Sequence, residues 1–268
     1  MILSVAPSGA RKTKKHHPAL PLSAKEIGRD AARCREAGAA MIHLHVRDDH
    51  GRDSLDPDAF RAAIDAVRRE AGNDFLIQIS TKAIGIHAPG AQMAVVGDVA
   101  PEAFSISIRE ILPDASLEPV VARFFHFEAS RGTLVQYILY DLNDLLRFES
   151  LVARGVLPVR NASQLFVLSG VSATPNSPTN ALLQYFSVRT IGLPWAVCAF
   201  DPHEAGCGAL AAALGGHPRV GFENNLFLPG GELAPDNAAL VANMARLAST
   251  IGRPLASPDA ARALFRVS

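Results

Sequence analysis

Two histidines separated by one residue form the segment of this sequence with the clearest chemistry. His43 and His45 lie in the apolar run 41–46, which is typical of a buried strand. Because side chains on a strand alternate between its two faces, both imidazoles point the same way and are close enough to bind one divalent metal ion. We therefore predict a metal site on this strand, although a chance alternation without metal gives the same pattern.

A carboxylate far along the chain supplies a candidate third ligand. The segment 214–225 reads LGGHPRVGFENN, and Glu223 comes at the end of a run that we predict to be a strand. Two imidazole nitrogens and one carboxylate oxygen leave coordination positions open, as catalytic sites do. Zinc, Zn2+, fits this donor set best.

Arg219 precedes Glu223 by four residues. A strand period of two places its side chain on the same face as Gly221 and Glu223. An inward-facing cation near a metal is unfavourable unless it meets a carboxylate. That carboxylate belongs either to a substrate or to the floor of the protein interior, and both interpretations remain open.

The elements that position these residues alternate between short strands and helices. We predict eight strands from their apolar runs, at 2–6, 41–46, 75–80, 104–108, 134–140, 164–168, 195–200 and 219–222. Helical patterns separate them, which is the rhythm of repeated βα units in a parallel sheet. Several runs are almost continuously apolar, as strands buried on both faces are.

Helix starts carry recognisable caps. The segment 23–26 reads as a capping box, and Asp56-Pro57 and Ser257-Pro258 each place a cap residue before proline. The fold class we predict is α/β, a (β/α)8 TIM barrel with an extra C-terminal helix. In such a barrel the site lies at the carboxyl ends of the strands, and strands two and eight flank strand one. The three candidate ligands can therefore converge.

Composition narrows the class of protein. The chain has 268 residues, 49% hydrophobic and 19% charged, with a formal net charge of zero. This suits a single barrel domain over 1–268 and argues against a nucleic-acid partner. No signal peptide or membrane-spanning segment is apparent, so we predict a cytoplasmic protein without a membrane partner.

Several motifs together resemble the β-keto acid cleavage enzyme family. They are HLHVRD at 43–48, GRDS at 51–54, LGGHPRVGFENN at 214–225, PLSAKEI at 21–27 and GRPLASPDAAR at 252–262. The resemblance implies a zinc-dependent barrel, usually a homotetramer, that converts a β-keto acid and acetyl-CoA into acetoacetate and a new acyl-CoA. It makes His43, His45 and Glu223 the metal ligands and Arg219 a catalytic residue.

Other strand-end residues are candidates for binding the substrate. Ser80 and Thr81 can hydrogen-bond its carboxylate or an oxyanion, although strand-end hydroxyls also cap helices. The basic loop 9–17, which contains Arg11, can receive an anionic tail or the phosphates of CoA, or it is a solvated run of charge. It disfavours an amine-bearing substrate. Ser107 and Arg109 are further substrate-binding candidates.

The sequence departs from the family pattern at four places. The aspartate to which the family's proton abstraction is assigned is Asn224 here, and an amide does not accept a proton at physiological pH. Gln136 stands where a glutamate is usual. Lys82-Ala83 replaces Gly-Gly. The fourth strand ends in Arg109-Glu110 rather than in small and amide residues.

These departures leave the catalytic base open. Glu110 is the substitute base we predict, with Asp141 and Asp201 as weaker candidates, unless Glu110 is an ordinary surface residue. Two other functions fit the sequence: a different metal-dependent carbon–carbon lyase or hydrolase, and a metal-binding barrel that has lost catalysis. Replacing Asn224 by aspartate should raise activity if a base has been lost there.

Overall fold

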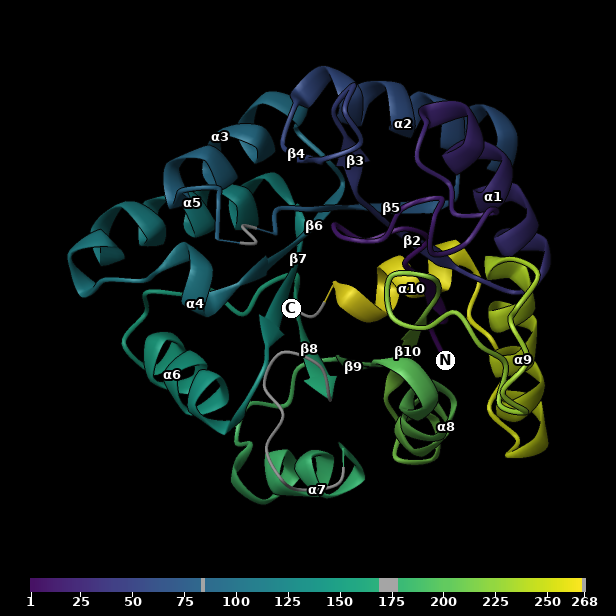
Figure 1. The fold of residues 1–268 in the computed structure, drawn as a ribbon. Helices are drawn as coiled ribbons and strands as arrows, with labels where there is room; N and C mark the ends of the chain where they lie inside the picture. The colour runs from purple at the N-terminus through teal and green to yellow at the C-terminus, as the bar shows by residue number, and fades with distance from the viewer. Residues whose placement is uncertain (83–84, 169–177, 267–268) are drawn as a thin grey trace.

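The computed structural model describes residues 1–82, 85–168 and 178–266. Eight parallel strands close into a barrel in the order β1-β10-β9-β8-β7-β6-β5-β2. Their bounds are β1 Ser4–Val5, β2 Met41–Leu44, β5 Leu76–Ser80, β6 Ala103–Ser107, β7 Leu134–Leu139, β8 Ala162–Leu168, β9 Trp195–Ala199 and β10 His217–Val220. The (β/α)8 barrel expected from the sequence is confirmed (Figure 1).

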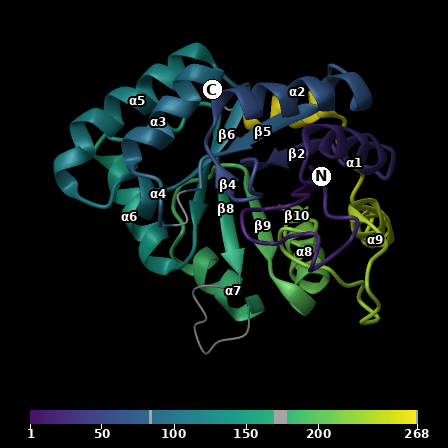
Figure 2. The same ribbon diagram turned by 45° about the horizontal axis from the view of Figure 1, so that its top comes forward.

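Helices surround the strands, as the repeated βα rhythm requires (Figures 1 and 2). They are α1 Ala24–Glu36, α2 Pro57–Ala71, α3 Pro89–Val99, α4 Ile108–Ile111, α5 Glu118–Arg131, α6 Leu142–Ala153, α7 Pro178–Val188, α8 Glu204–Ala213, α9 Asn237–Thr250 and α10 Pro258–Phe265, with short 3-10 turns at η1 Ala115–Leu117 and η2 Asp201–His203. The apolar faces of these helices pack on the outward-facing side chains of the strands and bury the core.

The predicted caps begin the predicted helices. Ser23 and Glu26 form a capping box at the start of α1. Asp56 and Ser257 accept backbone hydrogen bonds at the starts of α2 and α10, each followed by proline.

The extra C-terminal helix, α10, closes the amino-terminal end of the barrel. Its Ala261 and Phe265 are buried in one apolar cluster with residues at the starts of four strands, Met41, Leu76, Ala103 and Leu134. Figure 1 shows α10 across the middle of the ring of strands. This floor leaves the opposite, carboxyl end of the strands for the site.

Three local features differ from the sequence expectation. A small antiparallel hairpin, β3 Val46–Arg47 with β4 Asp53–Ser54, follows β2. β6 ends at Ser107 and the helix α4 begins at once, so Arg109 and Glu110 lie in a helix and not at a strand tip. β10 ends at Val220, which places Glu223 in a turn beyond the strand.

Candidate metal centre

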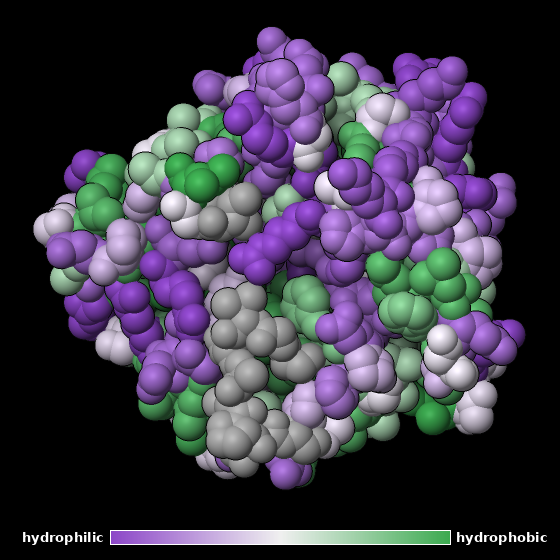
Figure 3. Space-filling model, viewed as in Figure 1, coloured by the Kyte–Doolittle hydropathy of each residue, from purple (hydrophilic) through white to green (hydrophobic). Residues whose placement is uncertain are grey.

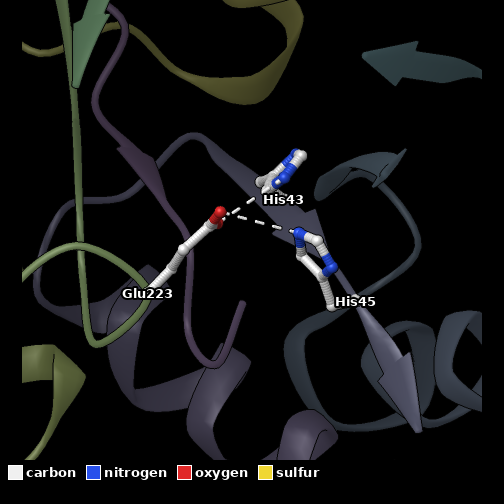
Figure 4. A group of neighbouring side chains, drawn as sticks. All are labelled: His43, His45 and Glu223. Atoms are coloured by element: carbon white, nitrogen blue, oxygen red, sulfur yellow. Dashed lines mark ion pairs between the residues drawn. The ribbon is translucent and has the colours of Figure 1, made fainter. Parts of the chain in front are cut away.

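The three predicted ligands meet at the carboxyl end of the barrel. His43 Nε2 lies 3.6 Å from Glu223 Oε2, and His45 Nε2 lies 3.6 Å from Glu223 Oε1 (Figure 4). One ligand atom from each residue falls within 4.8 Å of the others, and all three side chains are buried. Two ligands bound about 2.1 Å from one tetrahedral ion are roughly 3.4 Å apart. The spacing therefore fits ligands of a common metal ion.

The far nitrogens of both imidazoles are already engaged. His43 Nδ1 lies 2.8 Å from Gln78 Oε1, and His45 Nδ1 lies 3.1 Å from Asp53 Oδ1. These partners fix the ring orientation and leave each Nε2 directed at the centre, an arrangement typical of metal-binding histidines. Among the described residues, His45 Nε2 and Glu223 Oε2 are buried without a hydrogen-bond partner. Such orphaned acceptors fit a bound cation.

Burial and neighbouring charges favour a neutral His43 and an ionised Glu223, the protonation states that metal binding requires. Burial, together with the Arg219 guanidinium, holds the pKa of His43 well below its ordinary value. Burial alone would raise the pKa of Glu223, but Arg219 and His45 reverse this and hold it well below its ordinary value. The metal-binding atoms of a neutral imidazole and an ionised carboxylate are therefore available near neutral pH.

Cations surround Glu223. Arg219 Nη2 and Lys82 Nζ each lie 3.9 Å from Glu223 Oε1, and Lys12 Nζ donates a 2.7 Å hydrogen bond to the Glu223 carbonyl. Arg219 is buried, and its Nε and Nη1 have no hydrogen-bond partner among the described residues. Unpaired guanidinium N–H groups beside a metal site are suited to an anionic ligand.

The turn that carries Glu223 is fixed by its backbone. Gly221 has φ +130°, and a Cβ there would lie 2.5 Å from the Ala6 carbonyl oxygen, so only glycine fits. The Gly221 amide donates to Glu204 Oε2 (2.9 Å) and the Phe222 amide to Asn237 Oδ1 (2.7 Å). The Glu223 amide donates to Ala6 O (3.0 Å), which ties the turn to the chain leaving β1.

A small cavity opens beside the three ligands. It is lined by His43, Ser80, Lys82, Ile138, Tyr140, Val167, Phe200, Arg219 and Glu223. Of the substrate-binding candidates, only Ser80 is among these residues. Thr81 Oγ1 instead donates to the Ser105 carbonyl (3.0 Å), and Gln136 Oε1 accepts a long bond from Gln78 Nε2 (3.4 Å).

The remaining candidates are not among the lining residues, although the Arg109 guanidinium lies 5.0 Å from the ring centre of Tyr140, which is one of them. Arg109 donates to Asp141 and Asp144, with its Nη2 2.6 and 2.7 Å from their carboxylates, so these two residues occupy its guanidinium. Ser107 Oγ is buried without a hydrogen-bond partner in the described parts of the chain. Arg11 is exposed.

Asn224 is completely buried. Its Nδ2 donates to the Arg219 carbonyl (3.0 Å), while Oδ1 has no hydrogen-bond partner in the part of the chain that the structure describes. The side chain thus links the Glu223 turn to the backbone of β10.

Sequence reasoning missed four residues of the centre. Gln78 and Asp53 orient the histidines, Lys82 reaches Glu223, and Glu204 holds the turn. The side-chain alternation of β5 could have indicated Gln78, because residues 78 and 80 face the same side of the strand. Lys82 was recognised as a departure from the family pattern, but no neighbouring residue indicated that its side chain reaches Glu223. Ala83, its neighbour, lies outside the described residues.

The chain is similar over nearly its whole length to known proteins. The family model for beta-keto acid cleavage enzyme matches residues 1–267. A 3-keto-5-aminohexanoate cleavage enzyme of Fusobacterium nucleatum is 31% identical over 99% of this chain and 97% of its own length. A 3-oxoadipate:acetyl-CoA acetyltransferase of Cupriavidus necator is 27% identical over 98% of this chain and 94% of its own length.

Solved structures share the fold. ObcA, in a ternary complex with a C4-CoA adduct and oxalate, superimposes with a TM-score of 0.73 at 17% identity, covering 93% of this chain and 68% of ObcA. Within the described residues, no helix is both long and apolar enough to cross a membrane. Because the family model matches almost the whole chain, the chain belongs to the β-keto acid cleavage enzyme family, whose members are acyl-transferring enzymes that cleave carbon–carbon bonds.

Proposed function

We propose that this protein is a zinc-dependent enzyme that converts a β-keto acid and acetyl-CoA into acetoacetate and a new acyl-CoA. One observation carries this proposal. His45 Nε2 and Glu223 Oε2, which lack hydrogen-bond partners among the described residues, lie beside Arg219, whose Nε and Nη1 also lack them. A zinc ion would satisfy the acceptor atoms of His45 and Glu223, and the carboxylate of a keto acid bound to that ion would accept hydrogen bonds from Arg219. The names of the relatives agree with this chemistry.

His43, His45 and Glu223 would hold the metal. Zinc suits two imidazole nitrogens and one carboxylate oxygen with positions left for substrate. When bound, it supplies Lewis-acid polarisation of the keto oxygen. The fit rests on the spacing of the ligand atoms and on the engaged Nδ1 atoms of both histidines.

Residues of the chain orient the reactants. Arg219 and Lys82 direct the substrate carboxylate, and Ser80 at the cavity wall donates a hydrogen bond to a developing oxyanion. A base removes a proton from C2, and that carbon attacks the thioester carbonyl and expels CoA thiolate. The thiolate then adds to the former keto carbon. Cleavage of the bond between that carbon and C2 leaves the acyl group on CoA, and the electron pair left on C2 takes back the proton from the base, which releases acetoacetate.

Glu110 is the base we propose, because Asn224 has no basic group. Glu110 lies close enough to Tyr140, a residue of the cavity wall, to add to the effect of burial in raising the pKa of that phenol. Asn224 in this proposal keeps Arg219 in place through its hydrogen bond to the Arg219 carbonyl.

The charge of the site selects among substrates. Three cations lie around Glu223: Lys12 donates to its carbonyl, and Lys82 and Arg219 face its carboxylate. A substrate with an ammonium group close to the metal would be repelled by these cations. We therefore propose an anionic or neutral keto acid rather than an amino acid derivative, with the exposed Arg11 and the buried Ser107 as further candidates for contacts to the substrate or CoA.

Metal analysis and a coupled assay test the proposal. Protein purified without chelator should contain about one zinc per chain, and Glu223→Gln should lose it. Incubation with β-keto acids and acetyl-CoA should release acetoacetate and acyl-CoA in equal amounts. Protein that binds zinc but forms no acyl-CoA would disprove the reaction, and cleavage without acetyl-CoA would identify the alternative lyase or hydrolase.

We also propose a cytoplasmic homotetramer in which residues 1–268 form a single domain. Leu146 on α6 and Leu183 on the neighbouring α7 are exposed at 49% and 57%, and burial of such side chains between subunits is favourable. Sedimentation equilibrium measures the assembly, and cell fractionation measures the location.

A further inference from the structure

The mouth of the barrel is divided into a charged half and an apolar half. Charged and polar lining residues come from β2, β5 and β10 and the turns that follow them: His43, Ser80, Lys82, Arg219 and Glu223. The facing wall comes from the ends of β7, β8 and β9: Ile138, Tyr140, Val167 and Phe200. Strongly hydrophilic and hydrophobic side chains likewise lie next to one another at the middle of the face in Figure 3.

The apolar half continues below the cavity. Ile138, Leu165, Val167, Ala196 and Cys198 form one buried cluster, with Tyr140 and Phe200 packed against it. Strand register places them in rows, since Ile138 pairs with Leu165 and Val167 pairs with Cys198. The wall is therefore apolar over two rows and ends at Cys198, whose Sγ accepts a 3.4 Å hydrogen bond from Arg219 Nη2.

The charged half holds the groups that attract an anion. Arg219 is buried with two unpaired nitrogens, and the Lys82 side chain is 20% exposed above the cavity. A molecule with one carboxylate at the metal end satisfies these cations. Its other end then extends toward the wall of β7, β8 and β9, which among the described lining residues carries no charged side chain.

Resting on the function proposed above, we propose that the preferred substrates are β-keto acids with an uncharged aliphatic tail, which packs on Ile138, Val167 and Phe200. A second carboxylate or an ammonium group at the tail end would be desolvated there without a partner, which is strongly unfavourable. Each buried methylene instead stabilises the complex by an amount that corresponds to roughly a fourfold gain in affinity.

Equilibrium binding to the zinc-loaded protein without acetyl-CoA tests the preference apart from turnover. Calorimetric titration should show dissociation constants that fall about fourfold per methylene from 3-oxopentanoate to 3-oxohexanoate. The dicarboxylate 3-oxoadipate and an amino-substituted 3-oxohexanoate should bind at least about tenfold more weakly than 3-oxohexanoate. Equal or tighter binding of either charged acid, or no dependence on chain length, would overturn the inference.

Variants of the wall give a second readout. Val167→Lys should reverse the preference so that 3-oxoadipate binds better than 3-oxohexanoate, while Val159→Lys, in the exposed loop before β8, should leave it unchanged. If circular dichroism shows that Val167→Lys is unfolded, Val167→Thr, which keeps the shape, should still weaken 3-oxohexanoate binding several-fold. An unchanged order in a folded Val167→Lys or Val167→Thr variant would overturn the inference.

The two proposals fail separately. If the aliphatic acids bind in the expected order but no acyl-CoA forms with acetyl-CoA present, the reaction is wrong and the tail preference stands. If acyl-CoA forms but charged tails are preferred, the reaction stands and the wall has been misassigned.

Discussion

His45 Nδ1 and Asp53 Oδ1 lie 3.1 Å apart, although His45 stands between β2 and β3 and Asp53 begins β4. The hairpin β3–β4 thus delivers a carboxylate to the back of an imidazole of the candidate metal centre. Both side chains are buried, at 2% and 3% exposure, so the interaction is shielded from solvent.

Asp53→Asn should weaken zinc binding about 10- to 100-fold, because the ring loses the carboxylate that orients it and raises its basicity. Competition with a chromophoric chelator measures the affinity. Asp58→Asn, which changes a carboxylate on the surface of α2, is the matched control and should bind zinc normally. Equal affinity in both variants would mean that Asp53 has no part in the centre.

Arg219→Gln should lower kcat/KM about 100-fold or more, because a buried cation that faces the reacting carboxylate is lost. Arg109→Gln should change KM less than about twofold, since Asp141 and Asp144 already occupy that guanidinium. It should destabilise the fold by about 1–3 kcal/mol through the unpaired Asp144. Steady-state kinetics and urea unfolding separate the two effects. A large rise in KM for Arg109→Gln would restore Arg109 as a substrate ligand.

We predict that the free energy of unfolding depends on pH through Glu204. Burial raises its pKa to about 8, while hydrogen bonds from Asn225 and the Gly221 amide act in the opposite direction. A carboxyl group whose folded pKa exceeds its unfolded value binds a proton more tightly in the folded state. Its stabilising contribution is therefore present below about pH 4.5 and is lost as the pH rises to about 8.

Thermal melts at several pH values check this prediction. The wild-type melting temperature should fall between pH 5 and 8.5, and Glu204→Gln should flatten that fall because its side chain does not titrate. Glu118→Gln removes an exposed carboxyl group on α5 and serves as the control. An identical pH profile for wild type and Glu204→Gln would show that Glu204 is ionised throughout.

Asn224→Asp should destabilise the protein by about 1–3 kcal/mol without increasing kcat. A carboxylate there is fully buried, loses the donor to the Arg219 carbonyl and is absent from the cavity wall. Urea unfolding and the coupled assay measure the two quantities, with Asn243→Asp on α9 as a surface control. A rise in kcat would instead mean that the lost base acted from this position.

The sequence predicted the barrel from short-range periodicity, and the barrel in turn brings His43, His45 and Glu223 together, as predicted. His43 lies on β2 and His45 follows directly after its last residue, and the alternation of strands and helices prescribes which strands are neighbours. The family resemblance, carried by the same segments, is confirmed by the family match.

What the sequence left unpredicted depends on long-range contacts and on backbone bends. Ser107 ends β6 one residue earlier than the apolar pattern suggested, which turns Arg109 toward α6 and its two aspartates. Gly221 bends the chain out of β10, so Glu223 reaches the metal centre from a turn. Lys82 meets Glu223 across the barrel, and spacing along the chain carries no signal for that contact.

The helix α10, with Phe265 set among the strand starts, has a consequence for the order of events in the catalytic cycle. Because α10 closes the amino-terminal end of the barrel, reactants reach the small cavity beside Glu223 only from the carboxyl end. The molecule that sits deepest must arrive first and depart last. For the reaction proposed here, the keto acid settles before the bulky thioester can cover it.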